Sequence, residues 1–241
     1  PSSYEMNIPG NLVFRDVAPG FAYYRDDVTN IVWRENRHYH PDQRIDCSIG
    51  YDNDKQATWD SRFQPIVNYI SKKELDVGKI LDVGCNMGIF VFGTTQNNKW
   101  DVTGIDINKH AITRARNAHS DITDKIIHSN FLRYKFDNKF NTLVCSDVIN
   151  HVSDPDLFLS KCNDTLDVDG NMFVSFYDFG SKYADDKRQQ WEYVGVGEII
   201  TLFNEEVMKN MLSKNGFEIV DSYFDDHKTD EVKFLHCRKA N

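Results

Sequence analysis

The stretch Ile80-Leu-Asp-Val-Gly-Cys-Asn-Met-Gly-Ile-Phe90 decides the fold of this chain. Its first apolar residues predict a buried strand, Gly84 and Gly88 predict a turn, and the apolar residues that follow predict a helix. A glycine-bearing turn lets a ligand approach the backbone, because no Cβ stands in the way. Asp106 follows a second apolar strand, Trp100-Asp-Val-Thr-Gly-Ile105. It lies about 20 residues beyond the loop, where an acidic side chain can accept hydrogen bonds from a ribose. The pattern therefore predicts a site for an adenosine-containing cofactor.

The spacing of this loop differs from that of a dinucleotide-binding loop. The dinucleotide pattern is G-x-G-x-x-G, whereas here it is Asp82-x-Gly84-x-x-x-Gly88, with Asn86 in place of the middle glycine. Asp82 at the strand end would repel phosphate and favour a cation. The D-x-G-x-x-x-G form resembles the first motif of the class I S-adenosylmethionine-dependent methyltransferases. That resemblance implies S-adenosylmethionine as cofactor and S-adenosylhomocysteine as product. The alternative is an ordinary strand-turn-helix whose glycines serve packing.

Composition limits the classes of protein. The 241 residues, 40% of them hydrophobic, suffice for one large domain or a domain with an extension. No apolar run reaches the roughly 20 residues that cross a bilayer, and no secretory signal is visible at the start. Acidic residues exceed basic ones by 37 to 28 without a long basic block, which disfavours nucleic acid as the principal substrate. We expect a cytoplasmic protein, because scattered cysteines fit a reducing compartment: Cys47, Cys85, Cys145, Cys162 and Cys237.

Two parts follow one another along the chain. Residues 1–58 show no sustained periodicity and are expected to form an irregular extension or lid on the substrate side, with short strands around 20–24 and 31–33. Residues 59–241 are expected to form the S-adenosylmethionine-binding methyltransferase domain. They open with a helical pattern at 59–73 and then alternate between apolar strands and helices, which predicts βαβ units and a parallel sheet.

The end of the chain breaks this alternation. The segments 217–224 and 231–238 are joined by too few residues for a crossover helix, so these two strands should be antiparallel. Such a Rossmann-like α/β fold, a seven-stranded mostly parallel sheet with a C-terminal antiparallel hairpin and helices on both faces, is the arrangement of the family just named. The other predicted strands are 79–84, 101–106, 125–129, 141–146 and 171–178, and the helices are 88–97, 108–118, 155–167 and 204–214.

Two downstream segments narrow the resemblance. Cys145-Ser-Asp-Val-Ile-Asn-His-Val-Ser-Asp-Pro155 resembles the E-x-L-E-H-V-x-D-P stretch of members that methylate small molecules, notably the ubiquinone-pathway O-methyltransferases. Leu202–Val220 resembles the ending of a subgroup that acts on sugars, quinones, lipids and natural products. The resemblance implies methyl transfer to a hydroxyl or amine of a small molecule, such as a sugar, a quinone-like compound or a natural-product metabolite. A protein methyltransferase and a catalytically silent S-adenosylmethionine-binding regulatory module are the alternatives.

The resemblance also implies which residues contact the cofactor. Ligands of such sheets bind at the carboxyl ends of the strands. The methionine moiety would lie on the first loop, the ribose on Asp106, the adenine beside the second and third strand ends, and the sulfonium beside the fourth. Asn130 stands where the family usually has an acid, and Phe131 could equally belong to the core. The predicted cofactor-binding residues are Asp82, Gly84, Cys85, Asn86, Gly88, Asp106, Ile107, Asn130, Phe131, Ser146 and Asp147.

His151 and Asp147 are the candidate catalytic residues. A histidine near the acceptor can remove a proton as methyl transfer proceeds, or it can pack at the base of the site. In the ubiquinone-pathway subgroup two acids and the histidine can hold a divalent cation. The matching set here is Asp147, Asn150 and His151. One carboxylate, one amide and one imidazole could form a weak Mg²⁺ site, but the amide replaces a charged ligand, so a metal is not the expected cofactor.

The acceptor side is the least specified part of the sequence. In this fold the acceptor is usually held by the N-terminal extension, here residues 1–58, and by the insert after the fifth strand, here residues 177–193. Their aromatic side chains could wall off a pocket and exclude water around the reacting methyl group. They could also pack the extension onto the sheet. The substrate-side candidates are Tyr24, Trp33, His40, Tyr177 and Trp191.

Overall fold

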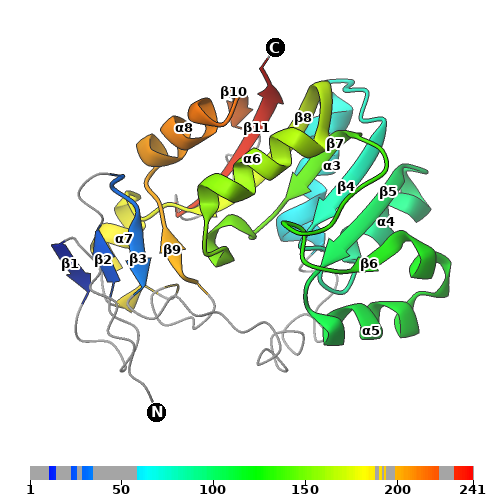
Figure 1. Cartoon of the computed structure of the whole chain (residues 1–241), viewed down its shortest axis with the longest axis horizontal. Helices are drawn as coiled ribbons and strands as arrows, with labels where there is room; N and C mark the ends of the chain where they lie inside the picture. The colour runs from blue at the N-terminus through cyan, green and yellow to red at the C-terminus, as the bar shows by residue number, and fades with distance from the viewer. Residues whose placement is uncertain are drawn as a thin grey trace.

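The chain folds around two β-sheets in a computed structural model (Figure 1). The larger sheet has seven strands and the smaller has four. The structure describes residues 11–14, 23–25, 29–34, 59–187, 190–191, 193, 199–222 and 231–240.

The larger sheet has the strand order β10-β11-β8-β7-β4-β5-β6. Strands β8 to β6 pair in parallel, whereas β11 pairs antiparallel with both β8 and β10. The predicted Rossmann-like α/β fold with a C-terminal antiparallel hairpin is therefore confirmed. The strands are β4 (Lys79–Val83), β5 (Asp101–Asp106), β6 (Ile126–His128), β7 (Phe140–Cys145), β8 (Leu166–Tyr177), β10 (Phe217–Ser222) and β11 (Val232–Lys239).

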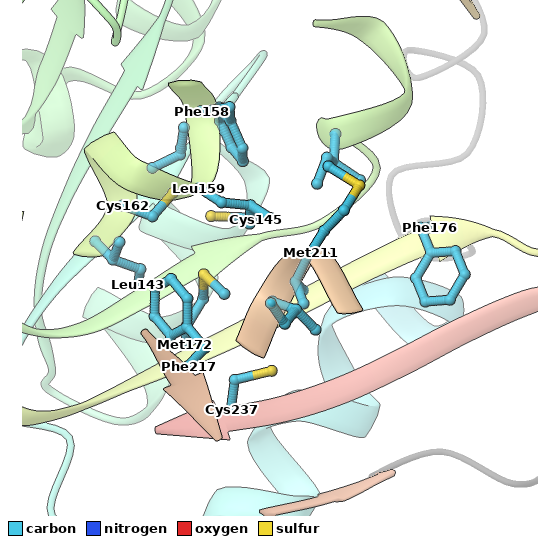
Figure 2. Packing of buried hydrophobic residues seen from close by; sticks show 14 of the residues in the cluster. Leu143, Cys145, Phe158, Leu159, Cys162, Met172, Phe176, Met211, Phe217 and Cys237 are labelled. Carbon is cyan, nitrogen blue, oxygen red and sulfur yellow. The ribbon is translucent and has the colours of Figure 1, made fainter. Parts of the chain in front are cut away.

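Helices cover both faces of this sheet. Successive residues of a strand point to opposite faces, so Leu143 and Cys145 join the core beneath α6 and α8, whereas Val144 joins the core beneath α3, α4 and α5. Figure 2 shows the first core, in which Cys145 lies beside Cys162 of α6. The helices are α3 (Gln64–Lys72), α4 (Ile89–Asn97), α5 (Lys109–Ala118), α6 (Pro155–Thr165) and α8 (Glu205–Lys214).

The helix predicted at 59–73 is divided. It opens with a π-helical turn, η2 (Trp59–Phe63), and α3 begins only at Gln64. Pro65 occupies the first turn of α3, where a missing N–H costs nothing, whereas inside a longer helix it would remove a hydrogen bond. The division turns η2 toward the carboxyl edge of the sheet, where it contacts the site described below.

Two boundaries after β7 also differ from the prediction. The helix predicted to reach residue 167 ends at Thr165, because Leu166 already pairs with Phe140 as β8 begins. The insert after β8 contains a helix that the sequence did not predict, α7 (Lys182–Lys187).

The smaller sheet pairs three strands of the N-terminal extension with one short strand from the C-terminal part of the chain. Its order is β1-β2-β3-β9 with antiparallel pairs throughout, and Figure 1 shows it beside the larger sheet. Short strands expected near 20–24 and 31–33 are present at slightly shifted positions. The predicted boundary after residue 58 lies beside residues outside the described part and stays a prediction. The strands are β1 (Asn11–Phe14), β2 (Tyr23–Arg25), β3 (Val32–Arg34) and β9 (Thr201–Leu202).

Within the described residues, no helix combines the length and the apolar character that crossing a bilayer requires.

Candidate functional site

The loop after β4 has a backbone that only small residues adopt easily. Gly84 and Gly88 have φ angles of +74° and +70°, in the left-handed region that glycine favours. A Cβ on Gly84 would lie 2.5 Å from Val148 Cγ2, and one on Gly88 would lie 2.7 Å from Ile126 Cδ1. The loop is therefore closely packed against Val148 and Ile126, and neither glycine position has room for a side chain.

Asp106 holds this loop in place. Its Oδ2 accepts a hydrogen bond from the Asn86 N–H at 2.9 Å, and its Oδ1 accepts one from the Asn108 N–H at 2.7 Å. These two bonds fix the orientation of the carboxylate. Asp106 thus couples the end of β5 to the loop, in addition to its predicted role toward a ribose.

Asp82 is the least satisfied polar group of the site. Its side chain is 2% exposed, and its Oδ2 has no hydrogen-bond partner among the described residues. Burial, followed by the charge of Asp106, raises the pKa of Asp82 to about 8. The Oδ1 of Asn86 is also buried without a partner in the described part of the chain. Buried polar atoms without partners are rare in native proteins and call for an explanation such as a missing ligand.

Cys85 faces the sheet rather than the loop opening. The position of a Cβ on Gly104 of β5 would lie 2.7 Å from Cys85 Sγ, and the thiol is buried. Burial raises the pKa of the Cys85 thiol, so it stays neutral. Any cofactor contact of Cys85 would therefore come from its backbone.

The predicted adenine-side residues are already partly occupied. Asn130 follows β6, and its Oδ1 accepts a hydrogen bond from the Leu132 N–H at 2.9 Å. Phe131 is buried and lies edge-on to Phe158 of α6 at a centroid distance of 5.6 Å. Ile107 is half-buried, and its carbonyl oxygen lies 3.2 Å from His128 Nε2. Phe131 is therefore part of the core, and adenine contacts by these three residues stay a prediction.

Asp147 sits where β7 ends, in a strained conformation. Its φ of +56° is unusual for a residue with a side chain. Ser175 of β8 supports it on two sides: Ser175 Oγ accepts from the Asp147 N–H at 2.9 Å and donates to Asp147 Oδ1 at 3.2 Å. The same Ser175 Oγ lies 3.5 Å from the hydroxyl of Ser146. The carboxylate of Asp147 also forms an ion pair with Arg62.

Arg62 is a residue that the sequence did not single out. It belongs to η2, whose Trp59 lies over Gly93 of α4 and whose Phe63 packs on Phe90 at a centroid distance of 5.3 Å. Through the ion pair with Asp147, η2 connects the helix after the glycine loop to the end of β7. A helical pattern interrupted by Pro65 was the only available sign that this segment turns toward the site.

Asn150 is a structural brace. It is fully buried; its Nδ2 donates to the Thr201 carbonyl at 2.7 Å, and its Oδ1 accepts from the Tyr177 N–H at 3.0 Å. Its backbone carbonyl accepts from the Ile200 N–H at 2.9 Å. These bonds join the turn after β7 to the end of β8 and to β9. Both polar atoms of the side chain are used in this way.

His151 closes the short helix η4 (Ile149–His151) at the same edge and is half-buried. Its backbone N–H donates to the Val148 carbonyl at 2.9 Å. Because Asn150 is committed to backbone groups, the trio with Asp147 and His151 is not assembled as a set of ligands. Among the described residues, no group of three or more His, Cys, Asp or Glu side chains could hold a metal ion.

Three aromatic residues predicted on the acceptor side are buried: Tyr177 and Trp191 belong to a separate small core, and Trp33 belongs to the core beneath α6 and α8. Trp33 is 8% exposed, Tyr177 5% and Trp191 1%. Trp191 Nε1 donates to the carboxylate of Glu231 at 2.6 Å, and Tyr177 stacks on Tyr193 at 3.8 Å between centroids. These side chains pack the smaller sheet and the insert onto the end of the larger sheet, so packing is their observed role.

The other two acceptor-side candidates are Tyr24 and His40. The backbone of Tyr24 pairs with Trp33 across β2 and β3. His40 lies outside the described residues.

Comparisons with known proteins agree with this geometry. A family model described as a methyltransferase domain matches residues 55–222. A tRNA U34 carboxymethyltransferase from Campylobacter curvus is 28% identical over 116 residues, covering 46% of this chain and 39% of that protein. A ubiquinone biosynthesis O-methyltransferase from Pseudomonas entomophila is 28% identical over 131 residues, covering 48% and 56% respectively. The chain thus spans about half or less of the length of these curated relatives.

Solved structures share the fold at low sequence identity. The magnesium protoporphyrin IX methyltransferase from Synechocystis, with S-adenosylhomocysteine bound, superposes with a TM-score of 0.60 at 16% identity, covering 73% of this chain and 81% of that chain. The N-methyltransferase NodS from Bradyrhizobium japonicum, also with S-adenosylhomocysteine, gives a TM-score of 0.58 at 16% identity, covering 84% and 100%.

Proposed function

The chain belongs to the methyltransferase domain family, and from that premise we propose that it transfers a methyl group from S-adenosylmethionine to a small molecule. The observation that carries the proposal is Asp82, a buried carboxylate without a hydrogen-bond partner among the described residues, beneath a loop of left-handed glycines. An ammonium or sulfonium ligand would satisfy it, whereas a phosphate would be repelled.

The residues present fit such a cofactor. The loop takes left-handed turns at Gly84 and Gly88, and two buried oxygens, on Asp82 and Asn86, face no donor in the described structure. Asp106 accepts hydrogen bonds from the N–H groups of Asn86 and Asn108, and in the proposed complex its carboxylate also accepts from the ribose hydroxyls. These hydrogen-bond acceptors therefore match a ligand that has an ammonium group and a ribose.

Arg62 extends this set to the carboxylate of the methionine moiety. Its guanidinium already pairs with a carboxylate at this edge, that of Asp147, and its side chain is 32% exposed. Guanidinium groups bind carboxylates in a two-pronged geometry. In the proposed complex Arg62 binds the carboxylate of the cofactor, and Asp82 binds the ammonium.

The bound cofactor would supply an activated methyl group on a positively charged sulfur, which an acceptor oxygen or nitrogen can attack in line. The protein then has to align the acceptor and exclude water. The hydrogen bonds of the Asn150 side chain support this task, because they hold the turn that contains His151 against β8 and β9. In the proposed reaction a ring nitrogen of His151 accepts the proton that the acceptor hydroxyl or amine loses.

A small acceptor is favoured by the way the smaller sheet is attached. It packs through buried aromatic residues and through β9 onto the end of the larger sheet, beside the carboxyl edge. Such a wall suits a metabolite better than a polymer. The tRNA-directed relative shares less than half of its length with this chain, so its substrate is not carried over. A quinone-like compound, a sugar or an amine metabolite is the proposed acceptor class.

Calorimetry tests the cofactor. We expect S-adenosylmethionine and S-adenosylhomocysteine both to bind, and Asp106→Asn to weaken binding about tenfold to a hundredfold, since hydrogen bonds to a charged group are lost. Asp101→Asn is the matched control, because Asp101 lies exposed at the opposite end of the same strand. Absence of binding by both ligands would refute the proposal.

An acceptor screen tests the reaction. Release of S-adenosylhomocysteine is measured over catechols and hydroquinones, sugars, and primary amines, with bulk protein and tRNA as further arms. Turnover on one of the small-molecule classes supports the proposal. Turnover only on protein or tRNA would overturn the acceptor class. Cofactor binding with no turnover on any arm would favour the silent regulatory module instead.

A further inference from the structure

The site contains two acidic side chains whose environments differ. Asp106 accepts hydrogen bonds from the backbone N–H groups of Asn86 and Asn108 at 2.9 and 2.7 Å, and such bonds favour the charged form of a carboxylate. Asp82, on the neighbouring strand, is 2% exposed and has an oxygen without a partner among the described residues. Two neighbouring acids, of which Asp82 is buried and Asp106 half-buried, do not both ionise readily. The proton therefore goes to Asp82.

Among the residues that the structure describes, no cation near Asp82 stabilises its charged form. Burial raises the pKa of the Cys85 thiol on the loop, and a hydrogen bond with Cys162 followed by burial raises that of Cys145 on β7, so both thiols are neutral. Arg116 of α5 donates to the Ile126 carbonyl at 2.7 Å and acts on the Cys85 thiol. The guanidinium of Arg62 is paired with Asp147. The described residues thus supply no cation to Asp82.

We propose, resting on the function proposed above, that Asp82 is protonated in the free protein and releases its proton to solvent when the ammonium end of the cofactor binds. Binding then exchanges a neutral acid for an ion pair with the ligand. The site is consequently pH-dependent: acidification weakens cofactor binding, because the ligand competes with a proton for the same carboxylate.

The raised pKa of Asp82, about 8, supports this order of events. At pH 6.5 a group with that pKa is almost fully protonated in the free protein. An ion pair with ammonium in the complex would lower the pKa well below 6.5. One proton per bound ligand should then be released, and the dissociation constant should rise about tenfold for each unit that the pH falls between 7 and 6.

Titration calorimetry in several buffers measures this proton directly. The probe is S-adenosylhomocysteine, which has the ammonium group and cannot react. At pH 6.5 its amine is charged, because ordinary α-amino groups titrate near pH 8. The observed enthalpy is plotted against the ionisation enthalpy of phosphate, imidazole and other buffers, and the slope gives the number of protons. We expect release of about one proton per ligand.

Variants identify the source of the proton. Asp82→Asn should bind more weakly and release almost none. His128→Gln and His151→Gln should release as much as the wild type, which excludes the two histidines of this edge, since histidine ordinarily titrates in the same range. If Asp82→Asn does not fold or binds too weakly, the pH dependence of the wild-type dissociation constant between pH 6 and 7 decides alone.

The outcomes separate this inference from the function on which it rests. Binding without proton release, or with an affinity that does not change between pH 6 and 7, overturns proton coupling and leaves the cofactor assignment intact. No binding at any pH overturns the cofactor assignment itself. Unchanged proton release in Asp82→Asn would also overturn the inference, because another group would then be the source.

Discussion

Two buried polar regions of this protein differ in how completely their hydrogen bonds are satisfied. Between the C-terminal hairpin and α3, the His236 ring of β11 has partners on both nitrogens: Tyr69 Oη lies 3.1 Å from Nδ1, and Asn171 Oδ1 lies 2.8 Å from Nε2. At the carboxyl edge, Asp82 and Asn86 each have a buried oxygen without a partner among the described residues. Both regions contain a titratable group with a displaced pKa. Of the two regions, only the second has buried oxygens that can still accept hydrogen bonds from a ligand.

The difference shows that a displaced pKa by itself does not identify a binding site. Burial lowers the pKa of His236 to about 4 and raises that of Asp82 to about 8, so in both cases the neutral form is favoured. The satisfied network stabilises packing between α3 and the C-terminal hairpin. The two unsatisfied oxygens, on Asp82 and Asn86, lower the stability of the free protein. Such a cost is expected at positions whose residues serve ligand binding rather than folding.

Replacing Asp82 should give the largest effect. Asp82→Asn removes the charge that binds the ammonium, and we expect S-adenosylhomocysteine to bind about 100-fold more weakly, or about 2.7 kcal/mol.

The stability of the fold should change in the opposite sense to the affinity in this variant. Because the folded-state pKa is raised, wild-type stability falls as pH rises from about 4 to above 8. Asp82→Asn should therefore be at least as stable as the wild type at pH 8.5 in urea denaturation. Weaker binding together with a clear loss of stability at that pH would make Asp82 a structural residue.

Asn150 lies at the carboxyl edge, but both polar atoms of its side chain are hydrogen-bonded, as in the network around His236. Replacing it tests whether such a residue stabilises the fold as that network does. In Asn150→Asp the carboxylate cannot donate to the Thr201 carbonyl, so two oxygens would face each other at a buried position. We expect a loss of about 2 to 3 kcal/mol of stability at pH 7.5. Part of it should return at acidic pH, where a protonated acid can donate again.

Asn163→Asp is the matched control for this change. Asn163 also braces two elements, through Nδ2 to the carbonyls of Asn215 and Gly216, but it is only half-buried. We expect a smaller loss there, about 1 kcal/mol. Equal losses in the two variants would contradict a special role for the buried brace.

His236 should make folding sensitive to acid. The unfolded chain binds a proton at this histidine near pH 6.5 and the folded chain only near pH 4, so its contribution is complete above pH 6.5 and is lost as the pH falls toward 4. Between pH 7.5 and pH 5 we expect a loss of about 2 kcal/mol from this group. Urea denaturation of the wild type and His236→Gln at both pH values isolates it, because carboxylates contribute equally to both proteins. The same pH dependence in both would exclude His236 as the cause.

Much of the fold and the first half of the site could be predicted because the evidence for them is local. The strand, the glycine loop and Asp106 lie within 27 consecutive residues, 80 to 106, and alternation of apolar residues marks the strands on either side. The predicted antiparallel hairpin also follows from a short connection. These features depend on neighbours in sequence, which a single chain displays.

The rest depends on contacts between distant residues. Asn150 lies 51 residues from Thr201 and Tyr69 lies 167 from His236, so neither partnership has a local pattern. Arg62 reaches Asp147 only because Pro65 divides the first helix. Phe131 could be read from sequence either as a cofactor contact or as core, and its edge-on packing against Phe158 places it in the core.

Tyr69→Phe should give the smallest effect and tests the satisfied network alone. With Nε2 of His236 donating to Asn171, the hydroxyl of Tyr69 donates either to Nδ1 at 3.1 Å or to Asp221 Oδ2 at 3.3 Å. Burial raises the pKa of Tyr69 to about 12, so the hydroxyl remains a donor throughout the accessible pH range. Its removal should cost about 1 kcal/mol of stability and, because the ring stays packed against Phe173, should leave the affinity for S-adenosylhomocysteine unchanged. A change in affinity would mean that the two regions are coupled through the sheet, and their separation into a stabilising and a binding region would fail.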